Sequence, residues 1–248
     1  MSAILIEICC GSLDDALAAQ AGGADRIELN SSLLQGGLTP SLGTLIEAKR
    51  RLTIPIMTMI RPRGGGFCYT DAEFAVMERD AELANAHGTD GLVFGVLHAD
   101  GTINLPRTRR LIAYAGERPV VFHRAFDVTP DPLVAMEQLI DLGVTRILTS
   151  GQEETVYNGA TLIRQLIERA AGRIEILPGG GIDRFNLPDV LARTGTAQIH
   201  LALLKAYSDP SALGKPHVFF GGALRPSEEV YEIIDATAVA AIKSDTNV

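Results

Sequence analysis

The sequence lacks the features of secreted, membrane-spanning and nucleic-acid-binding proteins. It has only three cysteines, too few for a disulfide framework, and no run of about 18 apolar residues that could span a bilayer. Its first seven residues contain no basic segment followed by an apolar run, so we expect no signal peptide. Basic residues number 22 against 30 acidic ones, which argues against a nucleic-acid partner. We therefore expect a cytoplasmic protein.

The chain also lacks any sign of a boundary between domains. No Ser/Pro/Gly-rich linker, low-complexity tract or long run of one charge interrupts its 248 residues. Apolar residues make up 46% and charged residues 21%, as in globular domains, and the length suits one α/β barrel. We therefore expect a single domain over residues 1–248.

Short apolar runs alternate with longer amphipathic stretches along the whole chain, the pattern of a parallel sheet with crossover helices. We expect strands at residues 3–9, 25–30, 54–61, 91–97, 119–124, 146–150, 173–177 and 197–201. We expect helices at residues 12–21, 41–51, 71–86, 106–115, 131–142, 158–171, 186–193 and 227–243. Eight such pairs predict a TIM (β/α)8 barrel.

The main alternative to a barrel is an open, doubly wound sheet that binds a dinucleotide. That fold needs a Gly-x-Gly-x-x-Gly turn after its first strand. Cys10-Gly11-Ser12 follows the first strand here, and no redox cofactor motif is visible. The connection over residues 203–227 is unusually long, and two interpretations of it stay open: a functional lid, or a surface segment that seals the barrel.

Several polar side chains occupy strand positions that should face the barrel interior. Side chains alternate along a strand, so when the isoleucines of a strand face the helices, their neighbours face inward. The inward set is Glu7, Arg26, Glu28, Arg61, His123, Gln198 and His200. Because an unpaired buried charge is costly, these groups must pair with one another or contact a ligand. Most lie in the C-terminal half of their strands, where barrel enzymes act, whereas Arg26 begins its strand and is expected to be structural.

The loops that follow the strands extend this candidate site. Carboxylates and imidazoles can transfer protons near neutral pH, so we interpret four residues as candidate catalytic groups: Glu7, Glu28, His123 and Asp127. Arginine side chains suit carboxylate or phosphate oxygens, so we expect substrate contacts from a second set: Arg61, Arg63, Arg124, Ser150, Gly179, Gly180 and His200. Two alternatives stay open: Arg124 and Asp127 could simply pair to hold their loop, and the glycine turn could pack closely instead of binding phosphate.

Motifs along nearly the whole chain resemble the CutC copper-homeostasis family. They run in order from the first strand to the seventh: Leu5-Ile6-Glu7-Ile8-Cys9, Gly22-Gly23-Ala24-Asp25-Arg26-Ile27-Glu28-Leu29, Gly36-Gly37-Leu38-Thr39-Pro40-Ser41, Met59-Ile60-Arg61-Pro62-Arg63-Gly64-Gly65, Phe122-His123-Arg124-Ala125-Phe126-Asp127, Leu148-Thr149-Ser150-Gly151 and Pro178-Gly179-Gly180-Gly181. The resemblance implies a TIM barrel and a cytoplasmic protein that handles copper, in many members as a homodimer.

The resemblance also implies copper(I) ligands, and there the sequence departs from the family. Copper(I) is attributed in the family to two cysteines, one near the end of each of the first two strands. Cys9 matches the first, but Asn30 stands at the second position. Copper(I) prefers soft sulfur ligands, so Asn30 weakens the expectation of copper(I) and leaves Cys9 as the candidate metal ligand.

Two hypotheses follow from the sequence. The resemblance implies a copper-homeostasis protein whose partner is a metal ion. The polar barrel mouth indicates instead an enzyme whose partner is a small, oxygen-rich, sugar-like or keto substrate: a lyase, hydratase, isomerase or hydrolase.

Overall fold

Eight short parallel strands form the centre of the computed structural model, which describes residues 4–222 and 227–246. The strands are β1 (Leu5–Cys10), β2 (Arg26–Leu29), β3 (Ile56–Met59), β4 (Gly91–Phe94), β5 (Val120–Phe122), β6 (Arg146–Thr149), β7 (Glu175–Pro178) and β8 (Gln198–Leu201). Their order is β7-β6-β5-β4-β3-β2-β1-β8, and a single parallel bridge between Gly179 and His200 joins the two ends. The nearly closed sheet confirms the predicted TIM barrel.

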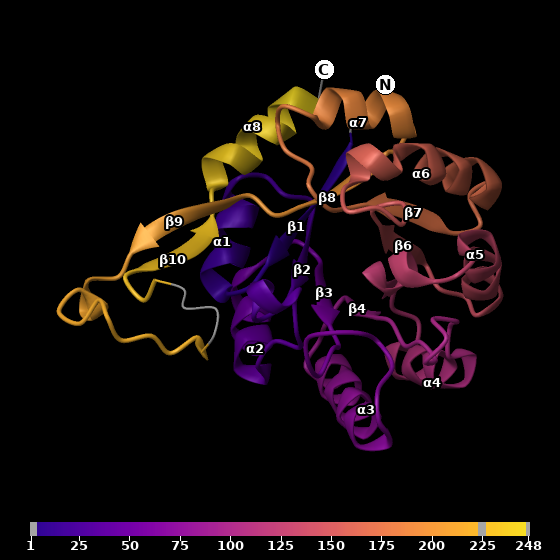
Figure 1. Ribbon diagram of the computed structural model, residues 1–248, viewed down its shortest axis with the longest axis horizontal. Helices are drawn as coiled ribbons and strands as arrows, with labels where there is room; N and C mark the ends of the chain where they lie inside the picture. Colours follow the sequence, from indigo (N-terminus) through magenta and orange to yellow (C-terminus); the bar gives the residue numbers. More distant parts are fainter. Residues whose placement is uncertain (1–3, 223–226, 247–248) are drawn as a thin grey trace.

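Helices surround this sheet, as Figure 1 shows. They are α1 (Leu13–Ala21), α2 (Leu42–Arg51), α3 (Asp71–Ala86), α4 (Leu105–Ala115), α5 (Pro132–Asp141), α6 (Val156–Ala170), α7 (Leu187–Thr194) and α8 (Ala236–Thr246). Three-residue and five-residue 3-10 turns occur at η1 (Leu33–Gln35), η2 (Arg124–Val128) and η3 (Pro210–Ala212). Many helices begin after a residue whose side-chain oxygen accepts a backbone N–H of the first turn: Ser12, Ser41, Thr70, Asn104, Asp131 and Thr155.

The buried apolar side chains form two separate clusters, as the alternation of strand residues predicts. The larger cluster lies between strands and helices and includes Ile6, Ile8 and Ile27. The smaller one fills the barrel interior with six side chains: Met57, Met59, Val93, Val121, Leu148 and Leu177. The polar residues of the same inward parity therefore lie above and below an apolar layer inside the barrel.

The register of the first strand decides which polar residues become neighbours. Glu7 lies opposite Arg26 of β2 on one side and opposite His200 of β8 on the other. Cys9, one inward position further along β1, lies opposite Glu28. One strand therefore brings together residues that are far apart in the sequence.

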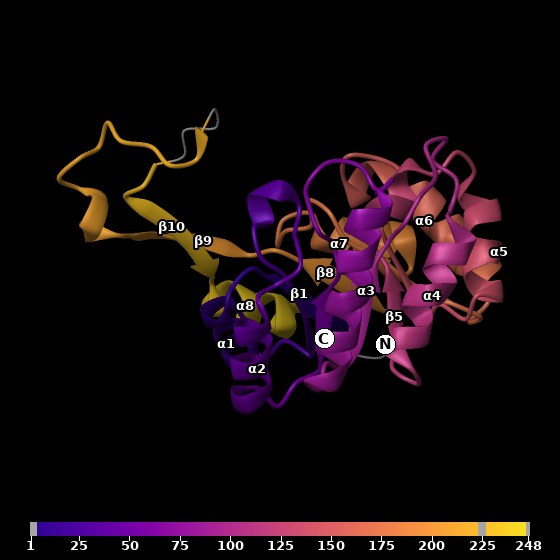
Figure 2. The ribbon, with the colours of Figure 1, turned by 90° about the horizontal axis from the view of Figure 1, so that it is seen from below.

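The expected helix at 227–243 is wrong in its first part. Residues Val230–Ile234 form strand β10, which pairs antiparallel with β9 (Leu204–Ser208), and only then does α8 begin. The β-branched and aromatic composition of Val230–Ile234 favours a strand, and the N–H of Ile234 donates to Asp15 Oδ1 at 2.8 Å. The hairpin projects from the barrel as an arm (Figure 2). Residue 3 of the expected first strand and residues 223–226 of the long connection lie outside the described residues.

No helix within residues 4–222 and 227–246 combines the length and the apolar character needed to cross a bilayer.

Candidate functional site

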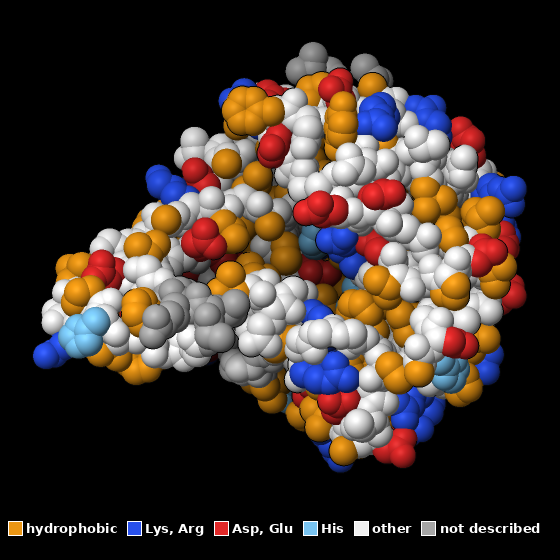
Figure 3. All heavy atoms as spheres, viewed as in Figure 1, with side chains coloured by type: hydrophobic (Ala, Val, Ile, Leu, Met, Phe, Trp, Pro, Cys, Tyr) orange, Lys and Arg blue, Asp and Glu red, His pale blue; other side chains and the backbone are white. Residues whose placement is uncertain are grey.

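A cavity of about 360 Å³ opens at the C-terminal ends of the barrel strands. Its polar wall consists of Cys9, Glu28, Arg61, His123, Arg124 and His200, together with the glycine turn after β7. Figure 3 shows a hollow near the centre of the view, with acidic, basic and histidine side chains inside it. The structure thus gathers most of the predicted site residues around one cavity, at the end of the barrel where the strand positions placed them.

Glu7 lies beneath this cavity, with 1% of its surface exposed, and it joins two layers of the interior. Its Oε2 accepts a hydrogen bond from Arg26 Nε, and its Oε1 lies 2.8 Å from His200 Nδ1. Burial alone would raise the pKa of Glu7, but the hydrogen bond from His200 and the charges of Arg26 and His200 outweigh it and lower the pKa to about 2. Glu7 is therefore a fixed anion that orients His200.

Glu28 is buried in the wall, and its two oxygens differ in their contacts. Oε2 accepts a hydrogen bond from Asn30 Nδ2 at 2.8 Å and lies 3.7 Å from Cys9 Sγ. Oε1 is buried without a hydrogen-bond partner among the described residues. Burial raises the pKa of Glu28, and the charge of Glu7 adds to the rise while His200 opposes it. Glu28 therefore retains a proton to higher pH than an ordinary carboxyl group.

Cys9, Glu28 and His200 form a group that can hold a metal ion. One donor atom from each, a sulfur, an oxygen and a nitrogen, lies within 4.8 Å of the other two. Desolvation raises the pKa of the Cys9 thiol well above its usual range, and the charge of Glu28 adds to that. Burial would lower the pKa of His200, but the carboxyl groups of Glu28 and Glu7 more than offset it and raise the pKa. A metal ion bound here must therefore displace protons.

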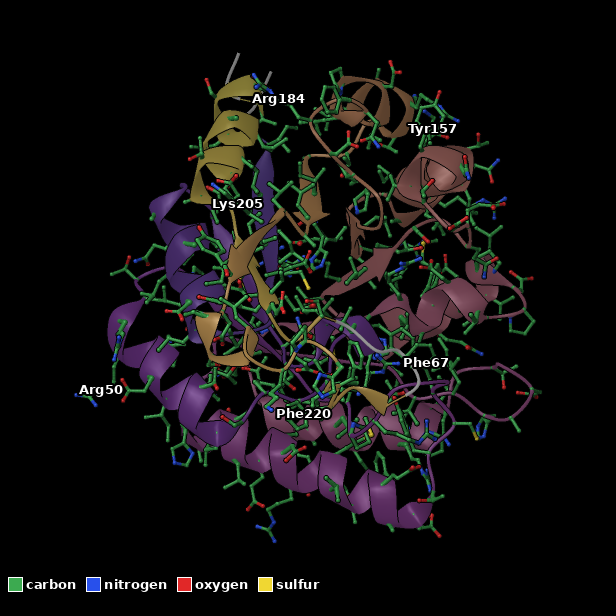
Figure 4. All side chains as sticks on the ribbon, turned by 60° about the vertical axis from the view of Figure 1, so that its left-hand side comes forward. Arg50, Phe67, Tyr157, Arg184, Lys205 and Phe220 are labelled. Carbon is green, nitrogen blue, oxygen red and sulfur yellow. The ribbon has the colours of Figure 1, made fainter. Side chains whose placement is uncertain are left out.

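Arg61, at the end of β3, fastens two loops to each other. Its Nη1 donates to the carbonyls of Gln35, Gly36 and Gly37 at 3.0 Å, and its Nη2 donates to that of Gly65 at 2.8 Å. The guanidinium also lies 5.1 Å from the ring centroid of Phe67, which Figure 4 labels. The predicted ligand-binding arginine therefore uses most of its donors on the protein itself.

His123, at the end of β5, is held in one orientation and in its neutral form. Its Nδ1 accepts the backbone N–H of Ala125 at 3.1 Å, and its ring packs 4.9 Å from the ring of Phe67, centroid to centroid. Burial and the nearby charge of Arg61 lower its pKa to about 3. Gly95 leaves the space that the ring occupies, because a Cβ there would lie 2.6 Å from His123 Cε1.

Arg124 lines the cavity, and its guanidinium is held in place by Asp127 and Ser150, which do not line the cavity. Arg124 Nε donates to Asp127 Oδ2 at 2.8 Å, and its Nη2 lies 2.6 Å from Ser150 Oγ. Asp127 also accepts the N–H of Ser150 at 3.0 Å. Gly180, with φ of +125°, brings the backbone close to Arg124, since a Cβ there would lie 3.2 Å from Nη1. These contacts show the loop-holding pair that the sequence left as an alternative.

Comparisons with known proteins show the family of this chain. The model of the CutC family matches residues 4–205. A family protein CutC of Treponema denticola is 53% identical over 233 residues, covering 94% of this chain and 95% of that protein. The copper homeostasis protein cutC homolog of Homo sapiens is 43% identical over 240 residues, covering 97% of this chain and 88% of that protein. This chain belongs to the CutC family.

A crystal structure of CutC from Streptococcus agalactiae supports the same assignment in three dimensions. It matches with a TM-score of 0.76 at 38% identity, covering 79% of this chain and 97% of that one. The family model ends at residue 205, so nearly all of the arm and α8 lie beyond the part of this CutC chain that it matches.

Arg63 is the one predicted substrate-binding arginine that does not line the cavity of this CutC chain. Its Nε donates to Glu73 Oε1 at 2.5 Å, and its Nη2 donates to the carbonyl of Cys68 at 3.0 Å. Glu73 also completes a capping box with Thr70 at the start of α3. Arg63 therefore joins its loop to a helix terminus.

The structure also shows contributors that sequence reasoning missed. Asn30 orients Glu28 and lies 3.4 Å from Cys9 Sγ, although the sequence marked it only as a departure from the CutC pattern. Arg146 joins the interior ion pairs through Glu175. The alternation of β6, in which Ile147 faces the helices, could have found Arg146. Phe67 had no comparable signal, because loop conformation decides its position.

Proposed function

We propose that this CutC-family chain serves copper homeostasis by binding one copper ion through Cys9, with His200 and Glu28 beside it. The names of its curated relatives support the role. The observation that supports the site is the approach of the three donor atoms to within 4.8 Å of one another at the cavity wall. The cavity gives an ion a path to them, since all three residues line it.

The chemistry of this donor set fits a borderline divalent ion more closely than copper(I). It offers one soft ligand, whereas copper(I) prefers several sulfurs. Cys10 belongs to the apolar cluster outside the barrel, and Cys68 is exposed in the loop after β3. Copper(I) and copper(II) must therefore both be tested.

A copper titration of the reduced, metal-free protein tests this proposal. We expect one equivalent of copper to compete successfully with a chelator, and we expect Cys9→Ala to lose that binding while Cys68→Ala retains it. Separate titrations with copper(I) and copper(II) identify the preferred ion. Equal binding by Cys9→Ala and the unmodified chain would contradict the proposed site.

We propose a second function for the same cavity: an enzyme that acts on a small, oxygen-rich, sugar-like or keto substrate. The observation that favours it is the pairing of a carboxyl group of raised pKa, Glu28, with a neutral imidazole, His123, in one cavity. An acid with a free oxygen and a neutral donor suit proton transfer next to a carbonyl. The class would be a lyase, hydratase, isomerase or hydrolase.

Turnover of a panel of keto acids, sugar acids and ketoses tests the second function. We expect Glu28→Gln to abolish any activity found, because the amide cannot transfer a proton. The matched control is Glu47→Gln, in an exposed ion pair on α2 away from the cavity, which should leave activity unchanged. Turnover that survives Glu28→Gln would exclude this carboxyl group as the acid.

The proposal places the protein in the cytoplasm, where its free cysteines stay reduced. The homodimer and the single domain stay predictions.

A further inference from the structure

The charges in the cavity wall are balanced unequally. Arg124 has the carboxylate of Asp127 beside it, and His200 has that of Glu7. Arg61, only 6% exposed, has no carboxylate within ion-pair distance anywhere in the described part of the chain. Its neighbours are backbone carbonyls, the ring of Phe67 and the phenol of Tyr69, none of which carries a negative charge at neutral pH, and its Nε is buried without a hydrogen-bond partner. A buried cation that lacks an anion is costly, so this end of the cavity favours a negatively charged ligand.

A second unpartnered donor lies close to Arg61. Because His123 Nδ1 accepts the N–H of Ala125, the proton of the neutral ring is on Nε2. This Nε2–H is buried without a partner among the described residues, although His123 is only 4% exposed. Both residues line the cavity and both pack on Phe67. A buried, unpartnered hydrogen-bond donor and a positive charge without a counter-ion therefore belong to the same wall of the cavity.

We infer that the cavity binds the carboxylate of a small hydroxy or keto acid between the Arg61 guanidinium and His123 Nε2–H. This inference names a substrate class for the enzyme proposed above, and its catalytic meaning rests on that second function. The volume of about 360 Å³ leaves room for more than a carboxylate. Glu28 lines the same cavity, and its buried, unpartnered Oε1 would pair with a hydroxyl or keto group of the same ligand.

The single positive charge at this end of the cavity favours a carboxylate over a phosphate, because a phosphate monoester carries about 1.5 to 2 negative charges. Arginine commonly binds carboxylates and phosphates alike through two parallel N–H donors of the guanidinium. Here Nη1 and Nη2 both donate to loop carbonyls, so that pair of donors is occupied. A carboxylate oxygen that accepts one hydrogen bond from His123 and lies beside the charge of Arg61 does not need those two donors. The low pKa of His123, about 3, keeps its ring a neutral donor at physiological pH.

Pyruvate is a suitable probe, with hydroxyacetone as its neutral counterpart of similar size. In protein with 15N-labelled histidine, we expect pyruvate to shift the His123 Nε2 resonance saturably and hydroxyacetone to leave it unchanged. His123→Phe, followed through ligand-observed NMR, should weaken pyruvate binding by about tenfold or more, the loss typical of one hydrogen bond to a charged group. Arg63→Gln is the matched control and should bind pyruvate as the unmodified chain does.

Two results would overturn the inference: equal binding of hydroxyacetone and pyruvate, or full pyruvate binding by a folded His123→Phe chain. The comparison of the two probes needs no substitution, so it decides the matter even where a variant fails to fold. Cys9→Ala separates this inference from copper binding, because it removes the proposed metal ligand and leaves both carboxylate contacts in place. Pyruvate binding without turnover of any hydroxy or keto acid would contradict the enzyme while leaving the carboxylate site standing.

Discussion

Both ends of the barrel interior contain buried charged groups, but the two ends differ in how completely these groups are paired and hydrogen-bonded. At the N-terminal end, Arg26 pairs with Glu7 and donates to Gln198, while Arg146 pairs with Glu175 at 2.5 Å. Gln198 also donates to Glu175, so the contacts form a connected network. At the mouth, three buried polar atoms in the cavity wall lack a partner among the described residues: Glu28 Oε1, Arg61 Nε and His123 Nε2.

Cavity size does not distinguish these ends, but hydrogen bonding does. The cavity at the N-terminal end is larger, about 450 Å³ against about 360 Å³ at the mouth. In its network a single described atom, Arg146 Nη1, lacks a partner. Buried polar groups in native proteins are normally satisfied, so unsatisfied groups that converge on one cavity indicate a ligand. Glu7 belongs to both ends, because one oxygen accepts from Arg26 and the other lies beside His200.

The largest expected effect comes from breaking the N-terminal network at Arg26. Arg26→Met leaves Glu7 as a buried anion whose one remaining ion-pair partner among the described residues is His200. Removing one partner of a buried ion pair typically costs about 3–5 kcal/mol, and we expect that loss in the free energy of unfolding measured with urea. Arg50→Met, in an exposed pair with Glu47, is the control and should cost at most about 1 kcal/mol. Similar losses in the two variants would contradict the structural role of the network.

Overpacking at the mouth should cost less stability and more function. In Gly95→Ala the new Cβ would lie 2.6 Å from His123 Cε1 and 2.7 Å from Ala125 Cβ. Overpacking of this kind typically costs about 1–3 kcal/mol, and it must displace the imidazole from its position. We expect a lower unfolding midpoint together with weaker pyruvate binding. Unchanged binding would show that the position of His123 does not matter to the ligand.

The loss of stability at acid pH should occur in different pH ranges for His123 at the mouth and for Glu7 in the ion network. Folding lowers the pKa of His123 from 6.5 to about 3. As pH falls below 6.5, the unfolded chain therefore binds a proton at this residue and the folded chain does not, so the free energy of unfolding decreases until pH approaches 3. Folding lowers the pKa of Glu7 from 4.5 to about 2, so the loss from Glu7 begins only below pH 4.5. Between pH 6.5 and 4.5, His123→Phe should therefore lose stability less steeply than the unmodified chain, by up to about 1.4 kcal/mol per pH unit. Parallel urea titrations across that range test this, and identical slopes would contradict a neutral His123.

The sequence predicted the barrel and the residues that face its interior, because both follow from the alternation of strand side chains. Glu28, Arg61, His123 and His200 all line the cavity as that alternation indicated. It could not predict which of these residues have partners, because the partners come from loops. The carbonyls that occupy Arg61 belong to residues 35–37 and 65, and their positions depend on loop conformation.

The end of the chain shows a different limit of sequence reasoning. The alternation of strands and helices predicts a helix over residues 227–243, yet residues 230–234 pair with Leu204–Ser208 to form the arm. Their N–H and C=O groups find partners about 25 residues earlier in the chain, which no local pattern reports. The β-branched and aromatic residues of this segment were the available signal.

The smallest expected effect comes from Arg63. It lies two residues after Arg61 in the sequence, but it belongs neither to the cavity wall nor to the N-terminal ion network. Its partner is Glu73 on α3, and 40% of the arginine side chain is exposed. Exposed ion pairs contribute about 0–1 kcal/mol, so Arg63→Gln should lower the free energy of unfolding by no more than that. Because Arg63 does not line the cavity, copper binding and pyruvate binding should both stay unchanged. A marked loss of either would mean that the loop after β3 rearranges when a ligand binds and brings Arg63 to the site.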